Sequence, residues 1–481
     1  MNSSRPDTSY SGIFGIGPSE ARRLLSAALS KGGDYADIFC EHTVNNELSL
    51  RDGEVNSARS NIDFGVGIRV LSGDRTGYAF SESTRMEDLM RAASTAAEIA
   101  RDSSSKVNLP EDCTPVDSAN HYPLLSDSSD WERHTVEEKK EYLLMLRDLI
   151  QQASERVINI TGRIGDQQTR ILFFNSLGQC FTDMRPMALM SATVVMQEGS
   201  RMENFYASKS YRKGFDFLSQ ELVQALADDV VKGCNRLFEA SRPPCGEMPV
   251  VMGAGGSGIL LHEAIGHSFE ADFNRKGTSI FSDRMGKLIC NPDINIVDDG
   301  TLPYFRGSVN VDDEGVPGQK TYMVRNGVLN SYLHDRISAR HYGVAPTGNG
   351  RRESFRYMPI PRMRSTYMEN GPATEEDLIR SVKKGIYVDN FANGQVQIGA
   401  GDFTFYVKSG YMIEDGHLTR PIKDTNIIGN GPEALAAITG VAGNLIVDDS
   451  TWTCGKGQYC PVSCGMPSVL VSKLNVGGIN E

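Results

Sequence analysis

Helical and strand-like patterns of apolar residues alternate along the first half of the chain. Apolar residues recur at the spacing of an amphipathic helix in four segments, residues 18–31, 85–101, 135–156 and 217–241. Apolar and polar residues alternate, as in half-buried strands, in three segments, residues 37–50, 65–81 and 157–206. We therefore expect this half to be an α+β unit built on a sheet.

The second half has a different pattern, in which short apolar runs are separated by glycine, aspartate and asparagine. Turn-forming sequences of this kind include DDG at residue 298, NVDDEGVPG at residue 310 and ANGQ at residue 392. Such a pattern is typical of a mostly antiparallel, barrel-like β domain with few helices. We expect one of those helices over residues 374–384.

A domain boundary is expected where the two patterns meet. The segment SRPPCG, residues 241–246, contains two prolines and a glycine, which stop the preceding helix. We therefore predict an N-terminal α+β domain over residues 1–241 and a C-terminal β domain over residues 242–481. A chain of 481 residues, 40% of them hydrophobic, is long enough for two such cores.

Charge and cysteine content narrow the class of protein. A formal net charge of −12 argues against a general nucleic-acid binder, because phosphate contacts need clustered Lys and Arg. The nine cysteines are unevenly spread and form no disulfide framework, so we expect a reducing compartment. No apolar run approaches the roughly 18 residues of a membrane helix, and the N-terminus lacks the pattern of a secretory signal. We expect a cytoplasmic protein that binds neither membranes nor nucleic acids directly.

Candidate chemistry is concentrated in residues 250–276, which read VVMGAGGSGILLHEAIGHSFEADFNRK. His262 and His267 lie five residues apart, so an unbroken helix would place their side chains roughly 140° apart around its axis. Gly266 allows the helix to end or bulge, which would bring His267 back toward His262. Both histidines are then candidate metal ligands, and Glu263 is placed to take a proton from water at that metal.

The same stretch also allows a dinucleotide-binding interpretation. The loop GAGGSG, residues 253–258, has G-x-G-x-x-G spacing after an apolar run. Glu270 and Asp272 follow at about the distance of a ribose-binding acid. A Rossmann unit also needs a second strand that ends at such an acid, and residues 259–271 contain no β pattern. A dinucleotide-binding oxidoreductase therefore stays as a lesser alternative to metal-dependent hydrolysis.

Long motifs across the second half resemble those of the TldD/PmbA family, in the TldD-like branch that keeps metal ligands. The matching motifs are HEAIGHSFEADFNRKGTS (262–279), SVNVDDEGVPG (308–318), LHDRISAR (333–340), PTGNGRRESFRYMPIPRM (346–363), KKGIYV (383–388), IEDGHLTRPIKDTNIIGNGPEAL (413–435) and CGKGQ (454–458). The first half resembles the family only in outline.

The resemblance implies a metallopeptidase that cleaves short or unstructured peptides. Carried over to this sequence, His262, His267 and Cys454 fall on the metal ligands, and Glu263 falls on the general base. Two imidazoles and one thiolate leave a tetrahedral position open for water, so we expect one divalent metal ion, zinc before iron. The resemblance also implies a dimer, either a homodimer or a heterodimer with a metal-free sister chain.

Several assignments stay open at the level of sequence. Cys460, Cys464 and Glu270 are rivals for the third ligand position. The two cysteines also fit packed thiols, and Glu270 and Asp272 fit partners that orient an imidazole. The RRE sequence at residues 351–353 fits either peptide binding or structural ion pairs. The alternative function is that of a non-catalytic, metal-containing protein with a peptide-binding or regulatory role. With either function, we expect the first half to be a scaffold or a cover.

Overall fold

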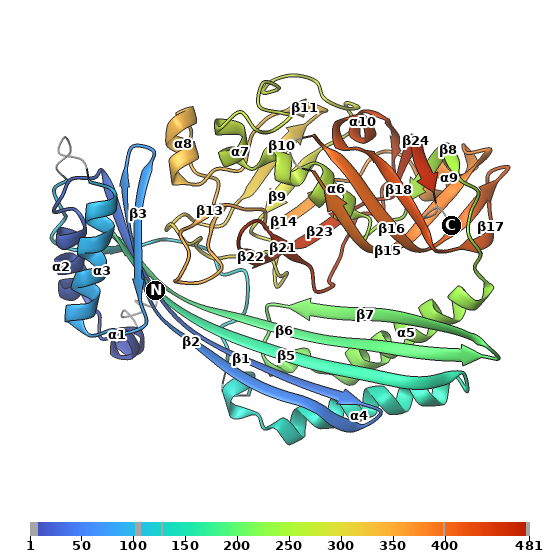
Figure 1. Cartoon of the computed structure of the whole chain (residues 1–481), viewed down its shortest axis with the longest axis horizontal. Helices are drawn as coiled ribbons and strands as arrows, with labels where there is room; N and C mark the ends of the chain where they lie inside the picture. Colours follow the sequence, from blue (N-terminus) through green and yellow to red (C-terminus); the bar gives the residue numbers. More distant parts are fainter. Residues whose placement is uncertain (1–7, 102–106, 127, 398–399, 478–481) are drawn as a thin grey trace.

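A long, curved sheet forms the centre of the N-terminal half (Figure 1). The structure is a computed structural model, and it describes residues 8–101, 107–126, 128–397 and 400–477. The strands run in the order β3, β2, β1, β5, β6, and both β7 and β4 pair with β6. Their bounds are β1 (Tyr35–Arg51), β2 (Glu54–Ser72), β3 (Arg75–Ser81), β4 (Thr114–Pro115), β5 (Val157–Asn175), β6 (Gln179–Glu198) and β7 (Arg201–Tyr211).

The first part of β2 is a strand that the apolar pattern did not predict. Residues 54–62 are polar for the most part and largely exposed, so they show no alternation of buried and exposed side chains. They are held in the sheet by antiparallel pairing with β1. Backbone hydrogen bonds to a neighbouring strand therefore override the weak local signal here.

Helices cover one face of this sheet. The four predicted helices are present as α2 (Pro18–Ala28), α3 (Met86–Ile99), α4 (Val136–Ala153) and α5 (Gln220–Glu239), and α1 (Thr8–Phe14) precedes them. Thr135 and Glu138 form a capping box that fixes the start of α4. Two apolar clusters lie between helices and sheet, one under α2 and α3 and the other under α4 and α5.

The C-terminal half contains a closed barrel of five strands. Its strands pair in the order β15, β8, β24, β18, β16, and β16 pairs back with β15. Their bounds are β8 (Gly246–Met252), β15 (Lys384–Val396), β16 (Asp402–Glu414), β18 (Thr425–Asn430) and β24 (Val469–Gly477), with β17 (His417–Ile422) and β19 (Ile438–Val441) attached outside the ring. All pairs in the ring are antiparallel except β8 with β15. The predicted α+β fold with a mostly antiparallel, barrel-like second half is confirmed.

A second sheet lies beside the barrel, in the order β11, β10, β9, β14, β23, β20. Its bounds are β9 (Ile296–Asp299), β10 (Lys320–Arg325), β11 (Val328–Leu329), β14 (Ser365–Met368), β20 (Ile446–Val447) and β23 (Ser463–Met466). The helix α6 (Gly258–Ala264) packs against β14 and β23 of this sheet and against β15 and β16 of the barrel. Further short elements are α7 (Ala271–Arg275), α8 (Arg336–Tyr342), α9 (Glu375–Arg380), α10 (Gly431–Ala436), β12 (Gly350–Arg351), β13 (Ile360–Pro361), η1 (Trp131–Arg133) and η2 (Phe215–Phe217), of which α9 was predicted.

The C-terminal half packs on the face of the long sheet that the helices leave free (Figure 1). Phe39 and Phe173 of that face pack with Val311 and Phe355 of the C-terminal half. Ion pairs accompany this contact: Arg69 of β2 pairs with Asp37 on its own sheet and, at 2.6 Å, with Glu314 across the boundary. Within the described residues, no helix is long and apolar enough to span a membrane.

Candidate active site

The glycine loop brings α6 into close contact with its neighbours. A Cβ on Gly258 would lie 2.4 Å from the backbone nitrogen of Gly465, so α6 reaches β23 only because residue 258 has no side chain. Gly255 has a φ of +89°, which favours glycine at the turn. Close packing and turn geometry therefore account for Gly258 and Gly255 without a bound dinucleotide.

The arrangement around β8 lacks the features that dinucleotide binding requires. The strand that pairs in parallel with β8 is β15, which begins about 120 residues after α6 ends, whereas the second strand of a dinucleotide-binding βαβ unit lies within about 30 residues. Glu270, the candidate ribose-binding acid, is fully buried and bonded to His267. The dinucleotide interpretation is therefore not supported by the fold.

The predicted break before His267 is present. The helix α6 ends at Ala264, and a 3₁₀ turn, η3 (Gly266–Phe269), begins two residues later. A Cβ on Gly266 would lie 2.2 Å from the sulfur of Met363, so any larger residue at this turn would require the Met363 side chain to move. The imidazoles of His262 and His267 now lie with ring centroids 5.1 Å apart and planes at 78°. The break thus brings together two side chains that a straight helix would separate.

Cys454 reaches the two histidines from a hairpin, β21 (Thr453–Gly455) and β22 (Tyr459–Pro461). Its Sγ lies 3.2 Å from Nε2 of His267. One ligand atom from each of His262, His267 and Cys454 can be chosen so that all three lie within 4.8 Å of one another, and all three residues are buried. This group is the candidate metal site.

The other two cysteines of this region do not belong to that group. Cys460 lies opposite Cys454 in the hairpin, and its Sγ accepts a hydrogen bond from Arg362 at 3.7 Å. Cys464 is buried on β23, where burial raises the pKa of its thiol. Both fit the packed-thiol interpretation of the sequence.

The group is electrostatically prepared for a cation. Neither ring nitrogen of His262 has a hydrogen-bond partner, although both are buried. Burial alone would raise the pKa of the Cys454 thiol, but the imidazoles of His262 and His267 outweigh it and lower that pKa to about 4. A buried polar group without a partner is costly, and a thiolate is a strong ligand for zinc or iron.

Glu270 orients His267. Its Oε2 lies 3.0 Å from Nδ1 of His267, so the carboxylate accepts that N–H and leaves Nε2 facing Cys454. Burial would raise the pKa of Glu270, but Lys456 and His267 outweigh burial and lower it to about 2. Of the two predicted orienting acids, only Glu270 contacts an imidazole, because Asp272 pairs with Lys456 at 2.6 Å.

Glu263 follows His262 directly and is partly exposed to solvent. Its side chain is 23% exposed, and its Oε2 lies 3.9 Å from Nε2 of His267. The carboxylate is thus beside the candidate ligands and still within reach of solvent. This is the position that a general base for water needs.

The RRE sequence has structural contacts. Arg351 donates to the carbonyl oxygens of Met363 and Pro461, at 2.6 and 2.8 Å. The backbone and guanidinium of Arg352 both donate to Asp313. Glu353 accepts the backbone N–H of Tyr459. All three side chains brace loops, so the peptide-binding interpretation receives no support.

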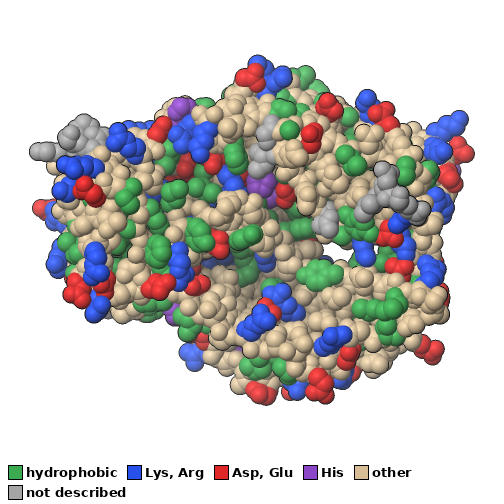
Figure 2. Space-filling model, viewed as in Figure 1, with side chains coloured by type: hydrophobic (Ala, Val, Ile, Leu, Met, Phe, Trp, Pro, Cys, Tyr) green, Lys and Arg blue, Asp and Glu red, His purple; other side chains and the backbone are tan. Residues whose placement is uncertain are grey.

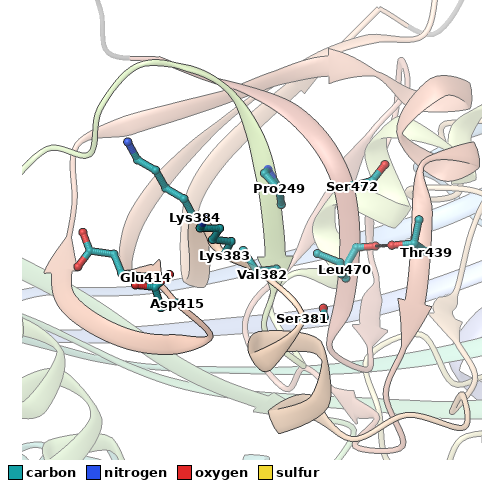
Figure 3. A pocket seen from close by; sticks show the side chains of 10 residues that line it. All are labelled: Pro249, Ser381, Val382, Lys383, Lys384, Glu414, Asp415, Thr439, Leu470 and Ser472. Carbon is teal, nitrogen blue, oxygen red and sulfur yellow. Dashed lines mark hydrogen bonds between the residues drawn. The ribbon is translucent and has the colours of Figure 1, made fainter.

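A hollow of about 820 Å³ lies against the barrel, at the ends of β15 and β24 (Figure 3). It is lined by Lys383, Lys384, Glu414 and Asp415, among others, and by no histidine or cysteine. Lys384 and Glu414 extend away from the barrel strands in this view. We assign no chemistry to this hollow.

Comparisons with known proteins agree with this description. Three models of one family match the chain: the PmbA/TldA metallopeptidase domain 1 over residues 36–100, the central domain over 129–235 and the C-terminal domain over 245–478. The "Metalloprotease TldD homolog" of Haemophilus influenzae is 36% identical over 454 residues, which cover 93% of either chain. A "Metalloprotease" of Methanothermobacter thermautotrophicus is 30% identical and covers 92% of this chain and 96% of its own.

Solved structures show the same fold. A putative modulator of a DNA gyrase from Thermotoga maritima has a TM-score of 0.77 at 21% identity, and TldE from Thermococcus kodakarensis has a TM-score of 0.73 at 20% identity. Either match covers 95% of this chain and 100% of the other. From the family models, the relatives and the fold together, the chain belongs to the PmbA/TldD family and is a metallopeptidase, a hydrolase.

Proposed function

We propose that His262, His267 and Cys454 bind one divalent metal ion, with zinc as the first expectation, and that Glu263 is the general base of peptide hydrolysis. The observation that carries this proposal is the convergence of three buried ligand atoms within 4.8 Å from segments almost 190 residues apart. Two imidazoles and one thiolate are the donor set and donor number of a catalytic zinc site, and iron also accepts them.

The charge of the surrounding side chains supports a divalent cation. Besides the Cys454 thiolate, three carboxylates lie in or beside the group, and two cationic side chains, Lys456 and Arg362, lie close to them. When both imidazoles are neutral, as metal ligands are, the negative charges exceed the positive charges by two. Without a metal, burial lowers the pKa of His267, but Glu270 and Cys454 outweigh burial and raise that pKa to about 10, so a proton on His267 offsets one of these charges. A buried excess of charge is costly unless an ion compensates it, and the excess matches one divalent cation.

When bound, such a cation would polarise the scissile carbonyl and make a water molecule acidic near neutral pH. The Glu263 carboxylate accepts the proton that this water loses as its oxygen attacks the carbonyl carbon. The protonated Glu263 then gives that proton to the leaving amine as the C–N bond breaks. Glu270 keeps the N–H of His267 on Nδ1, so that Nε2 stays available as a ligand.

The substrate would reach this site through the opening between the barrel and the long sheet, which Figure 2 shows from one side. A cavity of about 720 Å³ lies there between β7 and α5 on one wall and β15, β16 and residues 448–452 on the other. Its lining includes Gly256 of the glycine loop and Trp452, which is two residues from Cys454. The cavity therefore borders the two segments that lead into the proposed site, although none of the four proposed site residues lines it.

An extended peptide can pair with a strand edge that lines this passage. One edge of β7 pairs with β6, and the other edge faces the cavity. On that second edge the backbone N–H of Ser210 donates to the carbonyl oxygen of Asp449, and the part nearer Asn204 lines the cavity. A free strand edge offers backbone donors and acceptors to an extended chain. We therefore propose that short or unstructured peptides are cleaved and that folded proteins are excluded.

The proposal assigns the metal-binding and catalytic role to residues 242–481 and the role of scaffold and cover to residues 1–241. It includes a homodimer with two competent sites, since all four proposed site residues are present in this chain. A mixed pair with a chain like TldE, whose fold this chain shares, is the alternative. The thiolate ligand needs a reduced sulfur, so we propose the cytoplasm as the compartment.

Metal analysis of the purified protein, combined with digestion of one protein in native and denatured forms, tests this function. We expect one metal ion per chain and cleavage of the denatured form only. Light scattering on the same sample measures the assembly. A metal-free protein with full activity would refute the metal assignment, and equal cleavage of both forms would refute the proposed exclusion of folded substrates.

A further inference from the structure

The hairpin that carries Cys454 is too small to hold its own position. Its strands β21 and β22 have three residues each and pair only with one another among the described strands. A two-stranded hairpin of this size is marginally stable in water. The distance between Cys454 and His267 must therefore be set by contacts from other parts of the chain.

One such contact is made by Lys456, which leaves the hairpin two residues after Cys454. Its side chain is 8% exposed, and its Nζ lies 3.0 Å from Oε2 of Glu270 and 2.6 Å from Oδ1 of Asp272. The same Nζ donates to the carbonyl oxygen of Pro361 at 3.0 Å. Because Glu270 also accepts the N–H of His267, one carboxylate joins the hairpin to the imidazole.

A second contact comes from Arg362, which is fully buried. Its guanidinium donates to the carbonyl oxygens of Cys454 at 2.7 Å and of Gln458 at 2.9 Å, and so bridges β21 and the turn that leads to β22. Its Nε lies 3.8 Å from Oε1 of Glu270. Arg362 therefore meets the hairpin and the partner of His267 at the same time.

We propose that Lys456 and Arg362 are positioning residues of the metal site, which fix Cys454 against His267 by tying the hairpin to Glu270. This inference rests on the proposed function, because it assumes that Cys454 and His267 are ligands. Neither of these two side chains is a metal ligand, and neither takes part in proton transfer. Their effect is to hold two ligands from distant segments at the separation that one ion requires.

Arg351 of β12 contacts the same hairpin and supplies a matched control. It is buried, and it donates to the carbonyl oxygen of Pro461, the last residue of β22, at 2.8 Å. No hydrogen bond or ion pair joins Arg351 to Glu270 or Cys454 among the described residues. A general loss of packing should follow from Arg351→Met as from Arg362→Met, whereas loss of ligand positioning should follow only from the latter.

The test measures the Kd for Zn²⁺ of the full-length protein by competition with a chromophoric chelator. We expect Lys456→Met and Arg362→Met each to raise this Kd by about 10–100-fold, as loss of outer contacts to metal ligands does. Arg351→Met should stay within about threefold of the wild type, and Lys456→Arg, which keeps the cation, should recover most of the affinity. Thermal melting of the metal-free proteins checks that all variants are folded.

A milder variant keeps the test decisive if Lys456→Met or Arg362→Met does not fold. Asp272→Asn removes only one anchor of Lys456 and should raise the Kd in the same direction by a smaller factor. Unchanged Kd values in Lys456→Met and Arg362→Met, or a rise equal to that of Arg351→Met, would overturn the positioning role. If His262→Ala binds Zn²⁺ as tightly as the wild type, the proposed metal site itself fails, which is a separate result.

Discussion

Two buried groups of charged side chains in this molecule have opposite properties. The metal-site cluster consists of His262, His267, Cys454, Glu263, Glu270, Asp272, Lys456 and Arg362. The interface cluster, between the long sheet and the C-terminal half, consists of Asp37, Arg69, Arg185, Asp313, Glu314 and Arg352. Each acid of the interface cluster has a cation within hydrogen-bonding distance, and three arginines face three acids. The metal-site cluster has an imidazole with no partner on either nitrogen, and it carries two more negative than positive charges when both imidazoles are neutral.

The comparison shows that burial of charge does not by itself mark a functional site. Both clusters take several ionised groups out of water, which is costly unless each group finds a partner. The interface cluster meets that condition with protein groups alone, so it joins the two halves and offers nothing to a ligand. The metal-site cluster does not, and a cation would complete it. Variants of both clusters and a pH series test this distinction.

The largest effect is expected from removal of a proposed ligand. His262→Ala and Cys454→Ala should abolish stoichiometric metal binding, because two remaining donors hold a divalent ion weakly. Cys460→Ala and Cys464→Ala are matched controls and should keep the metal, since their thiols lie outside the group. Metal content per chain measures the outcome, and loss of metal in a control with Cys454→Ala unaffected would reassign the third ligand.

The next effect concerns Glu263, whose carboxylate lies beside the proposed ligands without being one of them. Glu263→Gln should leave the metal bound and lower kcat for peptide hydrolysis by at least ~10²–10⁴-fold, because the amide is not a base. Metal content and peptide cleavage are measured on the same preparation. Full turnover by the metal-loaded variant would remove Glu263 from the mechanism.

Removal of a charge from the interface cluster should lower the free energy of unfolding and leave metal binding unchanged. Arg69→Met leaves Asp37 and Glu314 buried with one cation fewer, so the free energy of unfolding should fall by about 3–5 kcal/mol. Urea unfolding measures the change, and Arg59→Met, an exposed position on the same strand, should change it by less than about 0.5 kcal/mol. A loss of metal affinity in the folded Arg69→Met protein would show that the two clusters are coupled.

The smallest effect is a difference in pH dependence between the two regions. Burial raises the pKa of Glu41, beside the interface cluster, to about 7, although hydrogen bonds from Thr43 and Phe355 oppose this. The protonated form of Glu41 therefore favours the folded state, and its contribution is present below pH 4.5 and lost as pH rises through about 7. The contribution of Glu270 to stability depends on pH in the opposite direction. The pKa of Glu270 is lowered to about 2, so its stabilising contribution is present above pH 4.5 and is lost as pH falls toward 2.

Unfolding of the metal-free protein between pH 4.5 and 8 isolates the Glu41 contribution. We expect Glu41→Gln to flatten the decline in stability over this range by up to about 3 kcal/mol, because the amide keeps the shape and loses the charge. Burial also raises the pKa of Asp312 to about 7. Part of the decline in stability with pH should therefore remain in the Glu41→Gln variant. An identical slope in the wild type and in Glu41→Gln would show that Glu41 does not titrate in this window.

The sequence by itself determined the elements and the chemistry of one segment. Periodicity located the four main helices and most strands of the first half, because each burial pattern repeats within a few residues of its own element. The five-residue spacing of His262 and His267, with Gly266 between them, required a break in the helix, and the break is present. The part of β2 that periodicity missed is exposed and is held by its neighbour β1.

Only the tertiary structure decided which other side chains surround the two histidines. The resemblance singled out Cys454 and left Cys460, Cys464 and Glu270 as rivals, but the packing of a hairpin against η3 is what brings Cys454 to 3.2 Å from His267. Lys456 and Arg362 carried no signal of their own, because a buried cation and an exposed one look alike in a sequence. Contacts between residues about 190 positions apart depend on how whole sheets pack, and no local periodicity encodes that packing.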